Sequence, residues 1–138
     1  MPLFKRKRTS LSILLFIVII AGLGSRSFGS ELPDFVAANA GDTLWSIAVY
    51  LCLGIISPTT PAWKLGLASL AISFAVEFSQ LIDHRWLNAV RDTLPGKLLL
   101  GRGFLPVDLI RYFVGAAFAY TMDLLFIRFQ STQSGSRE

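Results

Sequence analysis

The chain alternates between four long apolar runs and shorter connections rich in polar residues, glycine and proline. The runs cover residues 9–25, 42–57, 63–82 and 107–127. A transmembrane helix needs about 20 predominantly apolar residues, which the last two runs contain by themselves. The pattern therefore predicts an all-α fold: a polytopic membrane protein built as a compact bundle of four transmembrane helices.

The second run is short for a span, but the residues before it can extend it. Pro33 suits the first turn of a helix, and the carboxylate of Asp34 favours the positive helix terminus. A helix that begins at Asp34 and continues to Ser57 is long enough to cross the bilayer. The predicted spans then leave one long connection, residues 83–106.

This long connection carries a helical pattern of its own. Apolar residues recur at helical spacing at Trp86, Leu87, Val90 and Leu94. The pattern is typical of a short helix that lies at the membrane interface, and Pro95-Gly96 is expected to end it. Residues 128–138 are polar and are predicted to form a disordered tail.

Composition favours a single membrane domain over residues 1–138. Hydrophobic residues make up 53% of the chain and charged residues only 16%, whereas a soluble domain has about a quarter charged. The four basic residues 5–8 stand directly before the first run and account for the net charge of +4. Beside a membrane span, such a cluster is typical of the cytoplasmic side and of contact with anionic lipid, rather than of nucleic-acid binding.

The first run also admits a second interpretation. A basic start, an apolar stretch and small residues at Gly22, Gly24 and Ser25 resemble a signal peptide, whose removal would leave three spans. No clean Ala-x-Ala site is present, so we favour an uncleaved first span.

Ionisable residues interrupt the spans at one depth. At about 1.5 Å of rise per residue, Glu77, Asp42 and Arg111 come out roughly 21–24 Å above the cytoplasmic ends of their spans. Arg26 and Asp108 follow at roughly 25–28 Å. A charged residue inside a span is costly and by default marks a functional site. We therefore expect a charged layer near the outer interface, to which all four spans contribute.

The ligand-binding site is expected in and just above this layer. A Glu77–Arg111 pair, which Asp108 could join, is predicted for the centre of the bundle. Arginines of the long connection present forked donors that suit anionic headgroups or phosphates. The candidate ligand-binding residues are Glu77, Gln80, Asp108, Arg111, Asp42, Arg91 and Arg102.

Structural roles are the alternative for these residues. Charges near an interface meet water at little cost, and an ion pair can simply fix helix packing. We favour a structural role for Asp123, which lies near the inner end beside Arg128, and an ordinary interface position for His84.

Sequence motifs of catalysis and metal binding are absent. The chain has no Walker loop, no Gly-x-Ser-x-Gly, no His-Glu-x-x-His and no Cys-x-x-Cys. With one histidine and the single Cys52, we expect no metal site, no disulfide and no cofactor. An acid–base pair could be built from Glu77, Asp108 and His84, but their spacing does not require one, so an enzyme is not supported.

Ordered motifs of the chain resemble a known family. They are Gly41-Asp42-Thr43-Leu44-Trp45, Glu77-x-x-Gln80-Leu81, Arg91-Asp92-Thr93, Leu100-Gly101-x-Gly103-Phe104-Leu105, Asp108 and Tyr112-x-x-Gly115. From about residue 9 to residue 127 the chain resembles a small bacterial membrane family known only as domain of unknown function 2809. More distantly, the Glu-x-x-Gln followed by Arg, Asp and Gly resembles VanZ-like membrane proteins, which are linked to glycopeptide (teicoplanin) resistance. Those proteins tend to carry Asn between the Asp and the Gly, where this chain has Arg111-Tyr112.

Pattern and resemblance together predict a small multi-pass protein of the bacterial inner membrane, with both termini cytoplasmic. We expect it to bind an anionic envelope lipid or amphiphile at a polar outer-leaflet site, in a VanZ-like accessory role. Its expected partners are the lipid bilayer and an anionic lipid headgroup, not nucleic acid. Two other functions stay open: a small proton-coupled transporter with Glu77 as proton carrier, and a membrane-embedded hydrolase or transferase acting on a lipid-linked substrate.

Overall fold

The computed structural model describes residues 6–135, and every regular element in that range is helical. The elements are α1 (Arg8–Ser27), the short 3-10 helix η1 (Gly29–Glu31), α2 (Asp34–Ile56), α3 (Ala62–Ser79), α4 (Arg85–Asp92), α5 (Leu94–Leu99) and α6 (Pro106–Gly135). Four of them, α1, α2, α3 and α6, are long and apolar enough to cross a membrane. The predicted all-α fold with four spans is confirmed.

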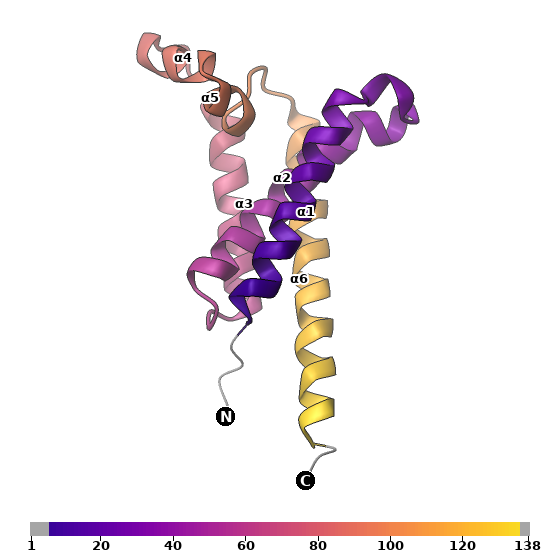
Figure 1. Cartoon of the computed structure of the whole chain (residues 1–138). Coiled ribbons are helices and arrows are strands. Elements are labelled where there is room, and N and C mark those ends of the chain that lie inside the picture. Colours follow the sequence, from indigo (N-terminus) through magenta and orange to yellow (C-terminus); the bar gives the residue numbers. More distant parts are fainter. Residues whose placement is uncertain (1–5, 136–138) are drawn as a thin grey trace.

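Helix α2 is the centre of the bundle. It packs against α1, α3 and α6, and α3 also packs against α6. The start of α1 and the end of α6 lie on one side of the molecule, whereas α4 and α5 lie at the opposite end (Figure 1). We call these two sides the termini end and the loop end. The connection between α1 and α2 also lies at the loop end.

Proline sets the start of three of the long helices. Pro33 and Pro61 directly precede α2 and α3, and Pro106 is the first residue of α6. Proline has a φ angle suited to a helix and no N–H to leave unpaired, so it is favoured where a helix begins. Helix α2 therefore begins at Asp34, the upstream start that Pro33 indicates.

Close packing between α2 and α6 depends on one glycine. A Cβ atom on Gly115 would lie 2.0 Å from the Ser46 Oγ and 2.2 Å from the Thr43 carbonyl oxygen. Ala116 and Ala119 continue this buried face of α6. Small residues let two helix backbones approach closely, which is a common way of packing spans in a membrane.

The long connection holds two short helices, not the single helix that the sequence predicts. Pro95-Gly96 does not end a helix but lies in the first turn of α5, where Thr93 Oγ1 accepts a hydrogen bond from the Gly96 N–H. The corner between α4 and α5 is tight: a Cβ atom on Gly96 would lie 1.7 Å from the Val90 carbonyl oxygen. The prediction failed because a proline is equally suited to starting a new helix.

Helix α6 is longer than the predicted span. It continues past residue 127 to Gly135, so the prediction of disorder is wrong for residues 128–135, while residues 136–138 lie outside the described part of the chain. Side chains within this extension bond back to the helix, as Ser131 Oγ does to the Ile127 carbonyl at 3.0 Å. Adding residues to an existing helix is far easier than starting one, because the costly nucleus has already formed.

Candidate functional site

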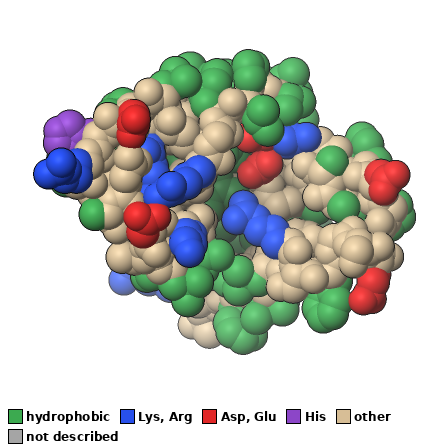
Figure 2. Space-filling model, turned by 90° about the horizontal axis from the view of Figure 1, so that it is seen from above, with side chains coloured by type: hydrophobic (Ala, Val, Ile, Leu, Met, Phe, Trp, Pro, Cys, Tyr) green, Lys and Arg blue, Asp and Glu red, His purple; other side chains and the backbone are tan. Residues whose placement is uncertain are grey.

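A polar pocket of about 350 Å³ opens at the loop end. Its walls come from α1, α2, α3, α5, α6 and the segment between α5 and α6. Figure 2, which looks onto this end, shows Lys and Arg side chains together with acidic side chains around a hollow. The charged residues that line the pocket are Arg26, Asp42, Lys97, Arg102 and Asp108.

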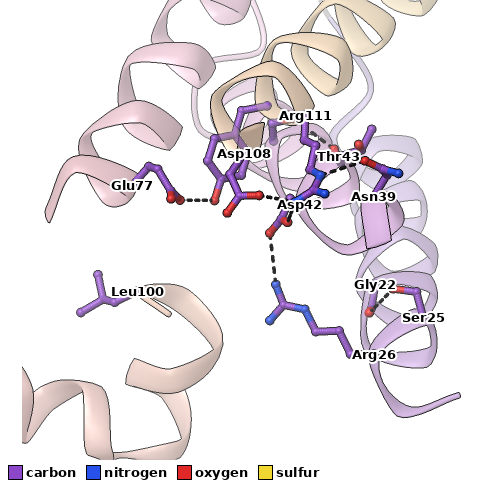
Figure 3. Close-up of polar contacts among 12 residues, drawn as sticks. Gly22, Ser25, Arg26, Asn39, Asp42, Thr43, Glu77, Leu100, Asp108 and Arg111 are labelled. Atoms are coloured by element: carbon purple, nitrogen blue, oxygen red, sulfur yellow. Dashed lines mark hydrogen bonds and ion pairs between the residues drawn. The ribbon is translucent and has the colours of Figure 1, made fainter. Parts of the chain in front are cut away.

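One of these acids, Asp42, is shared by arginines from two different helices, and Arg111 joins it to a second acid, Asp108. Arg111 Nη1 pairs with Asp108, one turn earlier on α6, and lies 3.5 Å from Asp42 Oδ2 on α2. Arg26 of α1 approaches the same Asp42 from the other side, with its Nη2 3.7 Å from Oδ1 (Figure 3). The network therefore joins α1, α2 and α6 at the depth where the sequence predicts a charged layer.

Partners limit what each arginine can still bind. Arg111 is occupied by the two acids and by the Asn39 side chain, to whose oxygen its Nε donates at 2.8 Å. The Arg26 side chain, in contrast, is 49% exposed, and among the described residues its ion pair is with Asp42. Arg102 pairs with Asp92, yet its side chain is 55% exposed and lines the pocket. Arg26, Arg102 and Lys97 are therefore the positive groups available to an anion that enters the pocket.

Glu77 lies behind the pocket wall and is fully buried. Its Oε1 accepts a hydrogen bond from the Leu105 N–H, and its Oε2 accepts one from the Tyr112 hydroxyl, both at 2.9 Å. Leu105 and Tyr112 both line the pocket. Glu77 thus positions two wall residues without lining the pocket itself.

The predicted Glu77–Arg111 pair is wrong. Arg111 pairs with Asp42 and Asp108, and the Glu77 carboxylate takes its hydrogen bonds from Leu105 and Tyr112. Neighbouring positions on a helix point about 100° apart, so Arg111 and Tyr112 cannot both face α3. Tyr112 takes the α3 side, and Arg111 faces α2.

Two polar atoms of the pocket residues have no partner among the described residues. They are the Gln80 Oε1 and the Trp45 Nε1, both of which are buried atoms. The other end of the Gln80 amide donates to the Leu100 carbonyl at 2.8 Å, which fixes its position. Buried polar atoms are nearly always hydrogen-bonded in proteins, so an unpaired acceptor and an unpaired donor beside a pocket point to a ligand or to water.

Arg91 is placed elsewhere. It is buried, and its guanidinium donates to the carbonyls of Ser79 and Ile82 at the end of α3, and to the Asn88 side chain. This guanidinium satisfies carbonyls that the helix terminus leaves unpaired. Arg91 therefore ties α4 to α3 and does not line the polar pocket.

The structure brings most of the predicted ligand-binding residues to this one place. Gln80, Asp42, Asp108 and Arg102 line the pocket, whereas Glu77 and Arg111 support its wall from behind. Trp45 and Tyr112 were not among the predicted ligand-binding residues, although both belong to the motifs that resemble the family. The spacing of neighbouring motif residues was a usable signal for both. Trp45 follows Asp42 by three residues, and Gly115 follows Tyr112 by three residues, so each pair shares one face of its helix.

A second polar cluster lies at the termini end, and its side chains bond to one another and line neither pocket. Asp123 of α6 pairs with Arg6 at 2.6 Å and accepts a hydrogen bond from the Tyr50 hydroxyl at 2.5 Å. Arg6 also donates to the carbonyls of Pro58 and Thr60 in the turn between α2 and α3. The partner of Asp123 is thus Arg6 and not Arg128. Arg128 lies five residues further along α6 than Asp123 and about 140° around the helix.

Groups of three or more His, Cys, Asp or Glu that could hold a metal ion do not occur among residues 6–135. The polar groups that line the pocket at the loop end are guanidinium and ammonium cations, carboxylates, an amide and an indole N–H. Such groups bind and orient a polar ligand.

Sequence comparison agrees with the family likeness noted above. The sequence model of a family described as "Protein of unknown function (DUF2809)" matches residues 31–116, which is more than half of the chain and includes most of the pocket residues. No solved structure was found to match the chain.

Proposed function

The chain belongs to the DUF2809 family of proteins of unknown function, and we propose that it binds an anionic membrane lipid or a similar amphiphile through the polar pocket at the loop end. The observation that carries this proposal is the pocket lining. Positive charge is offered there by Arg26, Lys97 and Arg102. Two buried atoms of the lining, the Gln80 Oε1 and the Trp45 Nε1, have no hydrogen-bond partner among the described residues.

The chemistry of the pocket suits a headgroup better than an isolated ion. Guanidinium groups bind phosphate and carboxylate oxygens through paired N–H donors. The acceptor on Gln80 suits a hydroxyl or amine donor, which the headgroup of a phospholipid such as phosphatidylglycerol carries next to its phosphate. A volume of about 350 Å³ is also within the range of roughly 300–1,000 Å³ that is usual for small-molecule sites.

We place the protein in the bacterial inner membrane, with both termini in the cytoplasm. The basic residues before α1 support this orientation. The loop end and its pocket then face the outer leaflet. We also propose an accessory role in the cell envelope, which the resemblance to VanZ-like proteins supports.

Native mass spectrometry of the purified protein would test the proposal. We expect the protein to retain phosphatidylglycerol in preference to phosphatidylcholine, and the double variant Arg26→Gln/Arg102→Gln to lose that preference. The matched control is Arg85→Gln, which changes an exposed arginine of the same end that does not line the pocket. A wild-type protein that retains both lipids equally would overturn the proposal.

Glu77 separates this function from the two alternatives. As a positioning residue it can be replaced by Gln, whose amide still bonds to Leu105 and Tyr112, so lipid preference should persist in Glu77→Gln. A proton carrier would instead show pH-dependent flux in proteoliposomes that Glu77→Gln abolishes. An enzyme would release product from a lipid-linked substrate. Either result would replace binding as the function.

A further inference from the structure

An apolar groove lies along α1 and α2, beside the polar pocket. It encloses about 380 Å³, and its lining includes Leu15, Val18, Leu44, Ala48 and Cys52. The polar pocket and the groove share four lining residues, Arg26, Trp45, Leu98 and Leu99. The two spaces therefore adjoin at the loop end. Charged side chains line the polar pocket, and mostly apolar side chains line the groove.

Helix α5 forms a wall common to both spaces. Lys97 lines only the polar pocket, whereas the next two residues, Leu98 and Leu99, line both spaces. Trp45 of α2 also lies at this junction, and its buried indole Nε1 has no partner among the described residues. An unpaired donor thus lies where a charged head and an apolar tail of one molecule would meet.

The length of the groove corresponds to one leaflet. From Arg26 to Leu15, helix α1 descends by roughly 16 Å, at about 1.5 Å per residue. The hydrocarbon core of a bilayer is about 30 Å thick, so one leaflet accounts for about half of it. A chain whose headgroup is in the polar pocket would therefore reach the end of the groove near the middle of the membrane.

We propose that the ligand of the polar pocket is an anionic acyl lipid of the surrounding bilayer and that one of its chains lies in the groove between α1 and α2. The carbonyl oxygen that links head and chain accepts the hydrogen bond of the Trp45 Nε1. This inference rests on the proposed function and narrows the ligand to a molecule with both an anionic head and a hydrocarbon tail. Charge complementarity at the head and the continuity of the two spaces select this occupant.

Photo-crosslinking with a labelled lysolipid would test where the chain lies. The probe is lysophosphatidylglycerol with a diazirine in the middle of its acyl chain, compared with the lysophosphatidylcholine of the same chain. We expect the anionic probe to label α1 and α2 residues of the groove, with peptides mapped by mass spectrometry. Unlabelled phosphatidylglycerol should compete for this labelling, and the neutral probe should label the groove weakly.

Two glycines of α1 supply a matched pair of variants. Gly22 lines the groove, and a Cβ atom there would make an ordinary contact with Leu44 at 3.9 Å, so a larger side chain can start there without a clash and extend into the space. Gly24 does not line the groove, and no atom lies within 4 Å of its Cβ position. We expect Gly22→Leu to lower groove labelling by about tenfold, the effect of displacing about two methylene groups, and Gly24→Leu to leave it unchanged.

The possible outcomes distinguish this inference from the proposed function. Retention of the anionic probe with labelling on the outer faces of α3 or α6 would overturn the groove assignment and leave headgroup binding intact. Equal groove labelling by both probes would mean ordinary boundary lipid and would also overturn it. If the protein shows no preference for phosphatidylglycerol over phosphatidylcholine in native mass spectrometry, the proposed function fails and this inference fails with it.

Discussion

The two ends of the bundle use similar residues in opposite ways. At the termini end, Arg6 is 5% exposed and is surrounded by a carboxylate and two backbone carbonyls. At the loop end, Arg26 is 49% exposed and lies 3.7 Å from Asp42, its acidic partner in the described part of the chain. Neither of the two pockets is lined by Arg6, Tyr50 or Asp123, whereas Arg26 lines both.

This difference separates packing from recognition. When every donor has an acceptor inside the protein, the polar groups stabilise the bundle and leave nothing for a ligand. When cations keep exposed surface and buried atoms stay unpaired beside a cavity, binding energy is still available. The loop end is therefore where we propose that a ligand binds, whereas the polar groups of the termini end connect the residues before α1 to α6.

Removal of the Arg6 side chain should cause the largest loss of stability, and it tests the comparison between the two ends. Arg6→Ala leaves Asp123, whose side chain is 10% exposed, without its counter-charge, and breaking a buried pair in this way typically costs about 3–5 kcal/mol of stability. The measurement is the free energy of unfolding in mixed micelles containing SDS. Arg128→Ala changes an exposed arginine of the same end and should stay within about 0.5 kcal/mol of wild type. A loss of phosphatidylglycerol preference in folded Arg6→Ala would break the division between the two ends.

Substitution of Glu77 should cause the next largest loss of stability. Glu77→Ala leaves the Leu105 N–H and the Tyr112 hydroxyl without their acceptor, at about 1–3 kcal/mol for the buried hydroxyl. Glu77→Gln keeps an acceptor for one donor and a donor for the tyrosine oxygen, so its loss should be clearly smaller. Unfolding in the same micelles gives the order. Equal losses for Ala and Gln would contradict a hydrogen-bonding role for the carboxylate.

Gly115→Ala should separate α2 from α6. The new methyl group would overlap the Ser46 Oγ and the Thr43 carbonyl, and overpacking of this kind costs about 1–3 kcal/mol. Because Asp42 and Arg111 lie on these two helices near the contact, lipid retention should fall along with stability. Gly66→Ala is the control, since its Cβ would lie 3.8 Å from Tyr120, an ordinary contact. A Gly115→Ala protein as stable as Gly66→Ala would disprove the close approach.

Trp45→Phe should give the smallest effect and sharpen the picture of the loop end. The substitution keeps an aromatic ring but removes the indole N–H, so the affinity for phosphatidylglycerol should fall by about 2- to 10-fold. Lipid titration followed by native mass spectrometry measures it, with unfolding as a check on stability. Trp86→Phe, at an exposed position outside both pockets, should leave the affinity unchanged.

Periodic and local features were predictable from the sequence. Four spans follow from the lengths of the apolar runs, and the start of α2 follows from Pro33, because both depend on residues close together in the chain. The charged layer also followed from counting the helical rise, which places Asp42 and Arg111 at one depth. Depth is a property of one helix at a time, so it needs no knowledge of how the helices are rotated.

Pairing across helices was not predictable in this way. Glu77 and Arg111 share a depth, yet the rotation of α6 turns Tyr112 toward Glu77 and Arg111 toward Asp42. The partner of Asp123 is Arg6, 117 residues away in the chain, which no local pattern indicates. Arg91 similarly resembles a headgroup ligand in sequence and instead completes the end of α3.

The sequence by itself determined that this protein is a four-span helical bundle with ionisable groups at one depth, because hydrophobic length and helical rise are local quantities. Only the tertiary structure decided which of those groups satisfy each other and which remain available. The fold of the 83–106 connection brings Leu98 and Leu99 to the lining of the same two spaces as Arg26 and Trp45. These shared residues join the polar pocket to the apolar groove, and they come from segments that are distant in the chain.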